Sequence, residues 1–181
     1  MKGKGVILLL AMMFIVSACA SGVNKPDLEP DNTDESPGYI GYVVNKEEGR
    51  ILVVDGIAVD YSATGGMNPY YSAAWYSSTE DLSEVEIGQK VGVWSEGEML
   101  TSYPGQGQAD HVSIIQTEQP VGAILSQSEA IRKALASDLI KDYEVPIITG
   151  VTYDAGESSW LIEVTRNNEE KIVGIKVADK D

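Results

Sequence analysis

The sequence is poorest in the residues on which most metal and nucleophilic sites are built. Its 181 residues include one cysteine, Cys19, and one histidine, His111. A single cysteine excludes an intramolecular disulfide, and a single histidine excludes a zinc site built on two histidines. Phenylalanine is also reduced to one, so nine tyrosines and three tryptophans supply the aromatic side chains. We expect no metal, no cofactor and no thiol catalysis.

Positive charge is scarce as well. The chain has 13 Lys and Arg residues against 28 Asp and Glu residues, a formal net charge of −15 at pH 7. A surface this acidic repels nucleic acid and anionic lipid headgroups. The hydrophobic fraction of 43% is nevertheless sufficient for a packed core. We expect a folded monomer with no nucleic-acid partner.

Long apolar runs are missing except at the N-terminus. Residues 6–16 form an apolar stretch too short for a stable transmembrane helix but typical of a signal peptide, and Lys2 and Lys4 precede it. Small residues then lead to Cys19, a pattern that resembles the lipobox of bacterial lipoproteins. The resemblance implies that residues 1–18 are a signal peptide and that Cys19 carries diacylglyceryl and palmitate chains. The alternative is an ordinary secretory signal followed by an incidental cysteine.

Residues 19–37 are acidic and contain three prolines. We interpret them as a tether, with a coil reach of about 20–25 Å. Their acidic residues lack the spacing of an EF-hand calcium loop, so a solvated linker is favoured over a calcium site.

Residues 38–118 carry the pattern of a small β-barrel. The apolar and aromatic runs predict five strands, with a short helical element at 79–86 and a long Gly/Ser/Pro-rich loop at 95–108. This order resembles an OB-type barrel. The expected strands are 38–44, 50–54, 69–78, 90–94 and 111–116.

Residues 119–181 predict a small α+β domain. Ser126 and Glu129 form a capping box that marks a helix start, and apolar residues follow at helical spacing as far as Leu139. Three alternating strands follow, which predicts a helix on a three-stranded antiparallel sheet. In element order this resembles the PepSY-type module of secreted bacterial proteins. With Pro120 at the joint, we expect separate cores on either side of about residue 120.

Five spaced motifs in the barrel region have a more particular likeness. They resemble the YobA-like domain of Bacillus-type lipoproteins, an uncharacterised family. The resemblance implies an envelope location in a Gram-positive, spore-forming type of bacterium, and it supplies no catalytic residues. The motifs are Gly38-Tyr39-Ile40, Arg50-Ile51-Leu52-Val53-Val54, Tyr71-Ser72-Ala73-Ala74-Trp75-Tyr76, Ile87-Gly88-Gln89-Lys90-Val91 and Ser102-Tyr103-Pro104-Gly105-Gln106.

Enzyme chemistry has little support. Asp110 and His111 are neighbours in a predicted strand, so their side chains point to opposite faces. Ser102 and Ser113 are possible partners of His111, but the sequence has no G-x-S-x-G nucleophile elbow. We therefore expect a protein that is not an enzyme.

A binding site is the better-supported hypothesis. OB-type barrels bind ligands on the face of strands two and three, beneath the loop between strands four and five. The aromatic and polar side chains there suit flat ligands, sugars or peptide segments. The alternatives are that the aromatic residues are barrel core and that Tyr103 belongs to a structural turn packed on the barrel. The candidate residues are Trp75, Tyr76, Ser102, Tyr103 and Gln106.

Together these patterns predict a protein outside the cytoplasm, held by lipid on the outer leaflet of the cell membrane. The expected role is binding or interaction at the envelope, with an envelope protein or a small ligand as partner. One alternative is a regulatory or inhibitory partner of an envelope enzyme, acting through residues 119–181. A hydrolase is the least favoured alternative.

The anchor prediction is tested by replacing Cys19 with serine. Stable attachment by acylation needs two chains, and the lipobox cysteine is the only thiol that can carry them. In cell fractionation, Cys19→Ser is therefore expected to move the protein from the membrane pellet to the soluble fraction. A variant that stays in the pellet contradicts the lipoprotein prediction.

Overall fold

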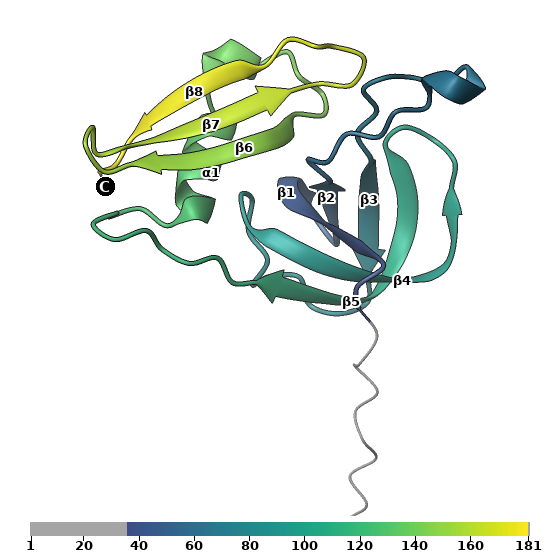
Figure 1. Ribbon diagram of the computed structural model, residues 1–181. Coiled ribbons are helices and arrows are strands. Elements are labelled where there is room, and N and C mark those ends of the chain that lie inside the picture. Colours follow the sequence, from purple (N-terminus) through teal and green to yellow (C-terminus); the bar gives the residue numbers. More distant parts are fainter. Residues whose placement is uncertain (1–35, 181) are drawn as a thin grey trace, which may run out of the picture. The chain divides into compact units, whose positions relative to one another are not determined.

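The computed structural model describes residues 36–180 (Figure 1). The predicted signal peptide, Cys19 and nearly all of the tether lie outside the described residues. No helix in the described part is long and apolar enough to cross a bilayer. From Ser36 onward the chain forms one compact unit, built from a five-stranded barrel followed by a helix and a three-stranded sheet.

The first five strands form a closed barrel, as the OB-like prediction required. It closes in the order β1-β2-β3-β5-β4, with β3 parallel to β5 and the other neighbours antiparallel. The mainly β, α+β architecture expected from the sequence is thereby confirmed. The strands are β1 (Tyr39–Glu47), β2 (Arg50–Val54), β3 (Ala73–Ser78), β4 (Lys90–Leu100) and β5 (Gly105–Ile115).

Two local predictions in the barrel are wrong. Residues 79–86 form turns rather than a helical element, because the Lys46 ammonium donates to the carbonyls of Leu82 and Val85 at 2.8 and 2.6 Å and holds the segment against β1. The predicted loop 95–108 is mostly strand, since β4 and β5 continue as a long hairpin that leaves only residues 101–104 as its turn.

The barrel interior follows the period-2 alternation of its strands. One face of each strand points inward and forms a buried cluster. Leu82 and Val85 from the turn segment close one side of it. The strand members are Val43, Ile51, Val53, Ala74, Tyr76, Val91, Val93 and Ala109.

The C-terminal part contains the predicted helix and meander. Helix α1 (Gln127–Leu135) begins at the capping box, where the Ser126 hydroxyl accepts from the Glu129 amide and the Glu129 carboxylate accepts from the Ser126 amide at 2.7 Å. The sheet has the antiparallel order β6-β7-β8, with bounds Ile147–Asp154, Ser159–Thr165 and Val173–Ala178.

The predicted apolar stripe ends earlier than expected. Helix α1 stops at Leu135, and the Ser137 hydroxyl caps a separate 3-10 turn, Asp138–Ile140, by accepting from the Leu139 amide. Leu139 consequently points outward and is 65% exposed, while Ile140 is buried in its place.

The two parts of the described chain share one hydrophobic cluster. The outer faces of β1, β2 and β3 contribute Val44, Leu52, Val54 and Ala73, and these pack with buried residues of α1 and the C-terminal sheet, among them Trp160. The prediction of separate cores on either side of residue 120 is therefore wrong. The alternation of the barrel strands indicated that their outer face is also apolar. It did not indicate that residues 119–181 cover this face.

Polar contacts fix this seam at several points. The Asn167 amide pairs with both backbone groups of Tyr71, accepting from its N–H at 2.6 Å and donating to its carbonyl at 2.8 Å. Gln127 donates to the Tyr42 hydroxyl at 2.7 Å, and Arg132 forms an ion pair with Glu86. These contacts place the turn between β7 and β8 beside the segment that leads into β3.

Asp179 organises the far end of the C-terminal sheet. Its carboxylate accepts from the amides of Ile124 and Leu125, both at 2.8 Å, from the Tyr153 hydroxyl at 3.1 Å and from the Trp160 indole at 3.3 Å. Burial of the side chain favours the neutral acid, but the four donors outweigh it and hold the pKa of Asp179 below its usual value.

This arrangement predicts an acid-sensitive contribution to stability. Because the folded-state pKa is lowered, the contribution is complete above the ordinary aspartate pKa of about 4 and is lost as the pH falls through the folded value. Asp179→Asn is expected to lower the melting temperature at pH 7 and to differ less from the parent at about pH 3.

Asp110→Asn is the control, because Asp110 is exposed on β5. Melting curves measured across this pH range by circular dichroism test the prediction. A difference between Asp179→Asn and the parent that stays constant with pH contradicts it.

Candidate functional site

The ligand face expected for an OB-type barrel is not free. On the outer side of β2 and β3, Leu52 and Val54 are each 1% exposed and Ala73 is 4% exposed, all beneath the C-terminal module. A ligand bound in the manner of other OB-type barrels would have to displace that module. The surfaces that stay open lie at the edges of the covered face.

Of the candidates on β3, Tyr76 does not reach the surface. It pairs with Ile51 on the inward side of the sheet and has no exposed area, so it is a barrel core residue. Trp75 points the other way and is half-buried against the shared cluster, with the Arg50 guanidinium 4.4 Å from its ring centroid. Gln106, its register partner on β5, is exposed.

Tyr103 lies in the turn between β4 and β5 and keeps 41% of its surface exposed. The Ser102 hydroxyl donates to the Pro104 carbonyl at 2.7 Å, which fixes the turn. The Tyr103 ring meets that of Tyr70 edge-on with 6.1 Å between centroids, and Tyr70 meets Tyr61 in the same way at 5.5 Å. We call these three residues the tyrosine ladder.

The segment between β2 and β3 carries the other two rings of the ladder. An isolated bridge between Val59 and Tyr70 closes this segment, and a 3-10 turn, Ser62–Thr64, forms its tip. The bridge holds Tyr61 and Tyr70 within ring contact of each other. Tyr70 was predicted as a strand residue and Tyr61 was not among the candidates, because no local pattern shows that the segment folds back beside the β4–β5 turn.

The hydroxyl of Tyr103 is kept neutral at physiological pH. Partial burial raises the pKa of Tyr103 to about 12, although the Asn167 side chain, by hydrogen bonding, acts in the opposite direction. A neutral phenol both donates and accepts a hydrogen bond, so Tyr103 offers a polar tip beside an apolar ring.

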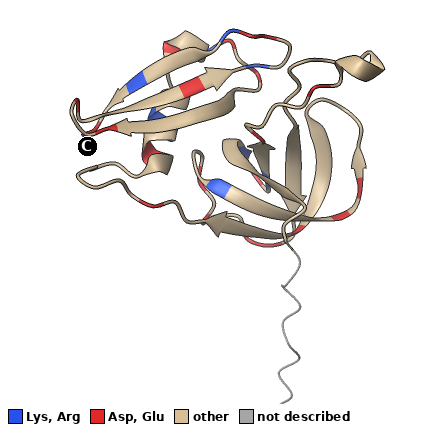
Figure 2. Cartoon of the chain, viewed as in Figure 1, with Lys and Arg blue, Asp and Glu red and all other residues tan. Residues whose placement is uncertain are grey.

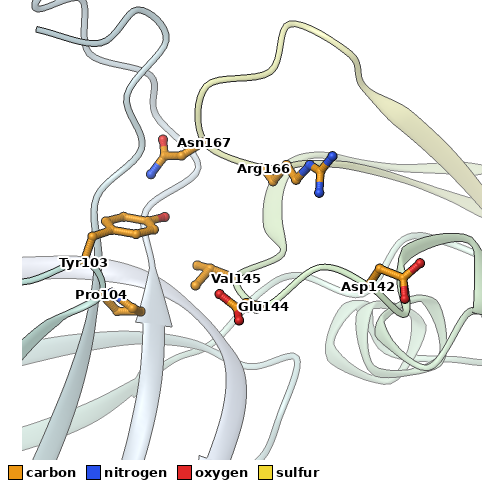
Figure 3. A pocket seen from close by; sticks show the side chains of 7 residues that line it. All are labelled: Tyr103, Pro104, Asp142, Glu144, Val145, Arg166 and Asn167. Atoms are coloured by element: carbon orange, nitrogen blue, oxygen red, sulfur yellow. The ribbon is translucent and has the colours of Figure 1, made fainter.

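A pocket of about 330 Å³ opens beside Tyr103 (Figure 3). Three segments meet there: the β4–β5 turn, the stretch that precedes β6 and the turn between β7 and β8. In Figure 3 the Tyr103 ring and the Asn167 amide face one another across one end, and Asp142 lies at the other. Its lining residues are Tyr103, Pro104, Asp142, Glu144, Val145, Arg166 and Asn167.

The pocket carries negative charge. Basic residues are sparse over the fold and acidic ones frequent (Figure 2). Arg166 is engaged, because it pairs with Glu169 and lies 5.1 Å over the ring of Tyr143. Asp142 and Glu144 are exposed and form no ion pair within residues 36–180. Neither carboxylate stands out in the sequence, since an acidic chain offers many of them and only the tertiary fold brings these two into one pocket with Tyr103.

A second hollow of about 350 Å³ is lined by other residues of the same turn, Thr101 and Ser102. Tyr70 and Ser102 line it, together with Met99 and Leu100 from the end of β4, which are 41% and 64% exposed. The tyrosine ladder, the pocket and this hollow adjoin the 101–104 turn. We refer to them together as the tyrosine surface.

The structure adds nothing to the hydrolase alternative. His111 Nδ1 lies 3.3 Å from a Glu80 carboxylate oxygen, and its ring lies 5.2 Å from that of Trp94. Within residues 36–180 it forms no hydrogen bond to Ser102 or Ser113. Nor do the described residues contain a group of three or more His, Cys, Asp or Glu side chains placed to hold a metal ion.

Comparison with known proteins finds one likeness, to an uncharacterised family. Residues 40–116 match the family described as "Protein of unknown function (DUF3221)". The match spans all five barrel strands and ends before α1, so it covers less than half of the chain. Searches of curated proteins and of solved structures give no match. The barrel is therefore similar to a domain of unknown function.

Proposed function

We propose that the chain is a binding module of the bacterial cell envelope, lipid-anchored through Cys19, that captures a basic polypeptide segment on the tyrosine surface. The observation that carries the proposal is the adjacency of the tyrosine ladder to a pocket with two unpaired carboxylates. The lipobox-like residues before Cys19 and the likeness to YobA-like lipoprotein domains support the location.

The aromatic part suits capture of a polypeptide. Tyrosine gives a large contact area with a polar tip and loses little side-chain entropy on binding, which explains its enrichment in interfaces. Ring contacts and the Ser102–Pro104 hydrogen bond hold Tyr103 in place before a partner arrives. A side chain fixed in this way avoids part of the ordering cost of association.

The carboxylates of the pocket favour a positively charged partner. Asp142 and Glu144 border the pocket without a cationic neighbour in ion-pair contact among the described residues, and the whole chain carries −15. Complementary charge accelerates encounter and rejects like-charged partners. A lysine or arginine side chain entering the pocket would place its apolar stem along Tyr103 and Val145 and its charge near the carboxylates.

The two hollows also favour an extended segment over a compact ligand. Both are lined by residues of one four-residue turn, Thr101 and Ser102 for the hollow and Tyr103 and Pro104 for the pocket. Side chains of an extended peptide point alternately to two sides, so alternate residues can enter the two hollows. Apolar side chains suit the hollow beside Met99 and Leu100, and basic ones suit the pocket.

The alternative of a regulatory or inhibitory partner of an envelope enzyme keeps one supporting observation. Five residues of the pocket lining, at positions 142, 144, 145, 166 and 167, come from the C-terminal part. A partner captured at the tyrosine surface would therefore contact that part as well as the barrel turn, and the captured segment in that case belongs to an enzyme.

Truncation of Tyr103 tests the proposal. The probe is a fluorescein-labelled decapeptide of alternating lysine and valine, with the glutamate–valine peptide as its charge control. In fluorescence anisotropy, Tyr103→Ala is expected to weaken binding of the lysine peptide by about tenfold or more. The free energy of unfolding should change by less than about 1 kcal/mol, because Tyr103 is half-exposed.

Leu161→Ala is the matched control, since Leu161 is 43% exposed on β7 outside the tyrosine surface. Its affinity for the lysine peptide should equal that of the parent. Unchanged binding in Tyr103→Ala, or equal binding of the glutamate peptide, contradicts the proposal. A loss of several kcal/mol in unfolding free energy would show instead that Tyr103 is a structural plug.

A further inference from the structure

A third hollow, of about 530 Å³, opens at the seam between the barrel and β6. It shares no lining residue with the tyrosine surface. Its lining includes apolar side chains from β1, from the segment after β2 and from β6, namely Ile40, Ile57 and Ile148, together with Pro37. Its volume lies within the range of small-molecule sites. We call it the Lys90 pocket, after the one basic residue in its lining.

Close backbone packing fixes the shape of this pocket. A Cβ atom at Gly41 would lie 2.4 Å from the Val54 carbonyl oxygen, and one at Gly56 would lie 2.1 Å from the Ile148 carbonyl oxygen. Both glycines line the pocket, so its floor consists of main chains that only glycine allows to approach this closely. The pocket is therefore formed before any ligand binds.

Lys90 gives the pocket a positive charge that the protein does not neutralise. The side chain is half-buried, and its ammonium lies 5.9 Å from the ring centroid of Tyr42. No carboxylate within residues 36–180 forms an ion pair with it. A half-buried charge without a partner costs free energy, and the chain has 28 acidic residues that could have paired with it. The unpaired Lys90 therefore indicates that an anionic ligand binds in the pocket.

Asp55 supplies the opposite charge in the same lining. One of its carboxylate oxygens accepts from the Ile57 amide at 2.9 Å, which orients the group. Asp55 and Lys90 are not in ion-pair contact with each other. The pocket thus presents a cation and an acceptor at separate points, with branched apolar side chains around them.

We propose that the Lys90 pocket binds an α-carboxylate that is attached to a small apolar residue bearing a nitrogen donor. Lys90 pairs with the carboxylate, Asp55 accepts from the nitrogen, and the isoleucine walls take the side chain. This chemistry occurs in a free aliphatic amino acid and in the C-terminal residue of a peptide. It is independent of the function proposed for the tyrosine surface.

Isothermal titration calorimetry of the full chain, solubilised in mild detergent, tests the proposal with L-leucine and leucinamide as probes. Leucine is expected to bind saturably, and leucinamide, which lacks the carboxylate, about tenfold more weakly or not at all. Lys90→Met keeps the apolar stem and removes the charge, so it should weaken leucine binding by about tenfold. Lys171→Met, an exposed lysine outside the pocket lining, is the matched control and should bind as the parent does.

A third probe, N-acetyl-leucine, distinguishes the two sources of the carboxylate. Affinity equal to that of leucine indicates a peptide C-terminus, because the amide N–H suffices for Asp55. Much weaker binding indicates a free amino acid whose ammonium pairs with Asp55, and Asp55→Asn should then weaken leucine alone. The asparagine keeps an acceptor for the Ile57 amide, so the fold is preserved.

Three results overturn the proposal: no saturable binding of leucine or N-acetyl-leucine, equal affinity for leucine and leucinamide, or unchanged leucine binding in a folded Lys90→Met. Circular dichroism establishes the folding of each variant. If Lys90→Met does not fold, the comparison of leucine with leucinamide on the parent decides.

Discussion

The structure depends on burial of the outer face of the barrel by the C-terminal helix and sheet. Leu52 and Val54 would be exposed if the barrel stood alone, and they are instead packed in one cluster with Trp160. At about 25 cal/mol per Å² of apolar surface, removal of such side chains from water is a main source of stability for both parts. The same contact closes the ligand face used by OB-type barrels and leaves the functional surfaces at its edges. The pocket beside Tyr103 and the Lys90 pocket both take residues from the barrel and from the C-terminal part.

Much of the fold could be predicted because its signals are local. Period-2 alternation placed the barrel strands, and the Ser126–Glu129 capping box placed the start of α1. Where tertiary contacts overrode local signals, prediction failed. Residues 95–108 look like a loop by composition, yet their backbone groups continue the β4–β5 ladder. Alternation also gave Tyr76 two possible faces and did not tell which one pointed into the barrel. Nor could it show that two apolar patterns 100 residues apart form one cluster, because sequence periodicity carries no information on which faces meet.

The site was predicted only in part, for a related reason. Tyr103 stood out because Pro104 and the nearby glycines marked a turn, and the turn is real although shorter than expected. Asn167 and Glu144 carry no local signal. They come from the β7–β8 turn and from the stretch before β6, and the packing of the C-terminal part on the barrel brings them into one pocket with Tyr103. The two proposed sites lie along the contact between the barrel and the C-terminal part, and they carry opposite charges. One presents unpaired carboxylates beside tyrosines, and the other presents the unpaired ammonium of Lys90 among isoleucines.

The central claim is that the barrel and the C-terminal sheet are stable only together. Native-state amide hydrogen exchange in increasing denaturant measures it most directly, because it gives an opening free energy for each strand. The account predicts the same opening free energy, equal to that of global unfolding, for Leu52 and Val54 in β2 and for Ile162 and Val164 in β7. Loss of protection in β6, β7 and β8 at a much lower free energy, with β2 still fully protected, would contradict it. Such a result would mean that the barrel stays folded when the C-terminal sheet no longer covers its outer face.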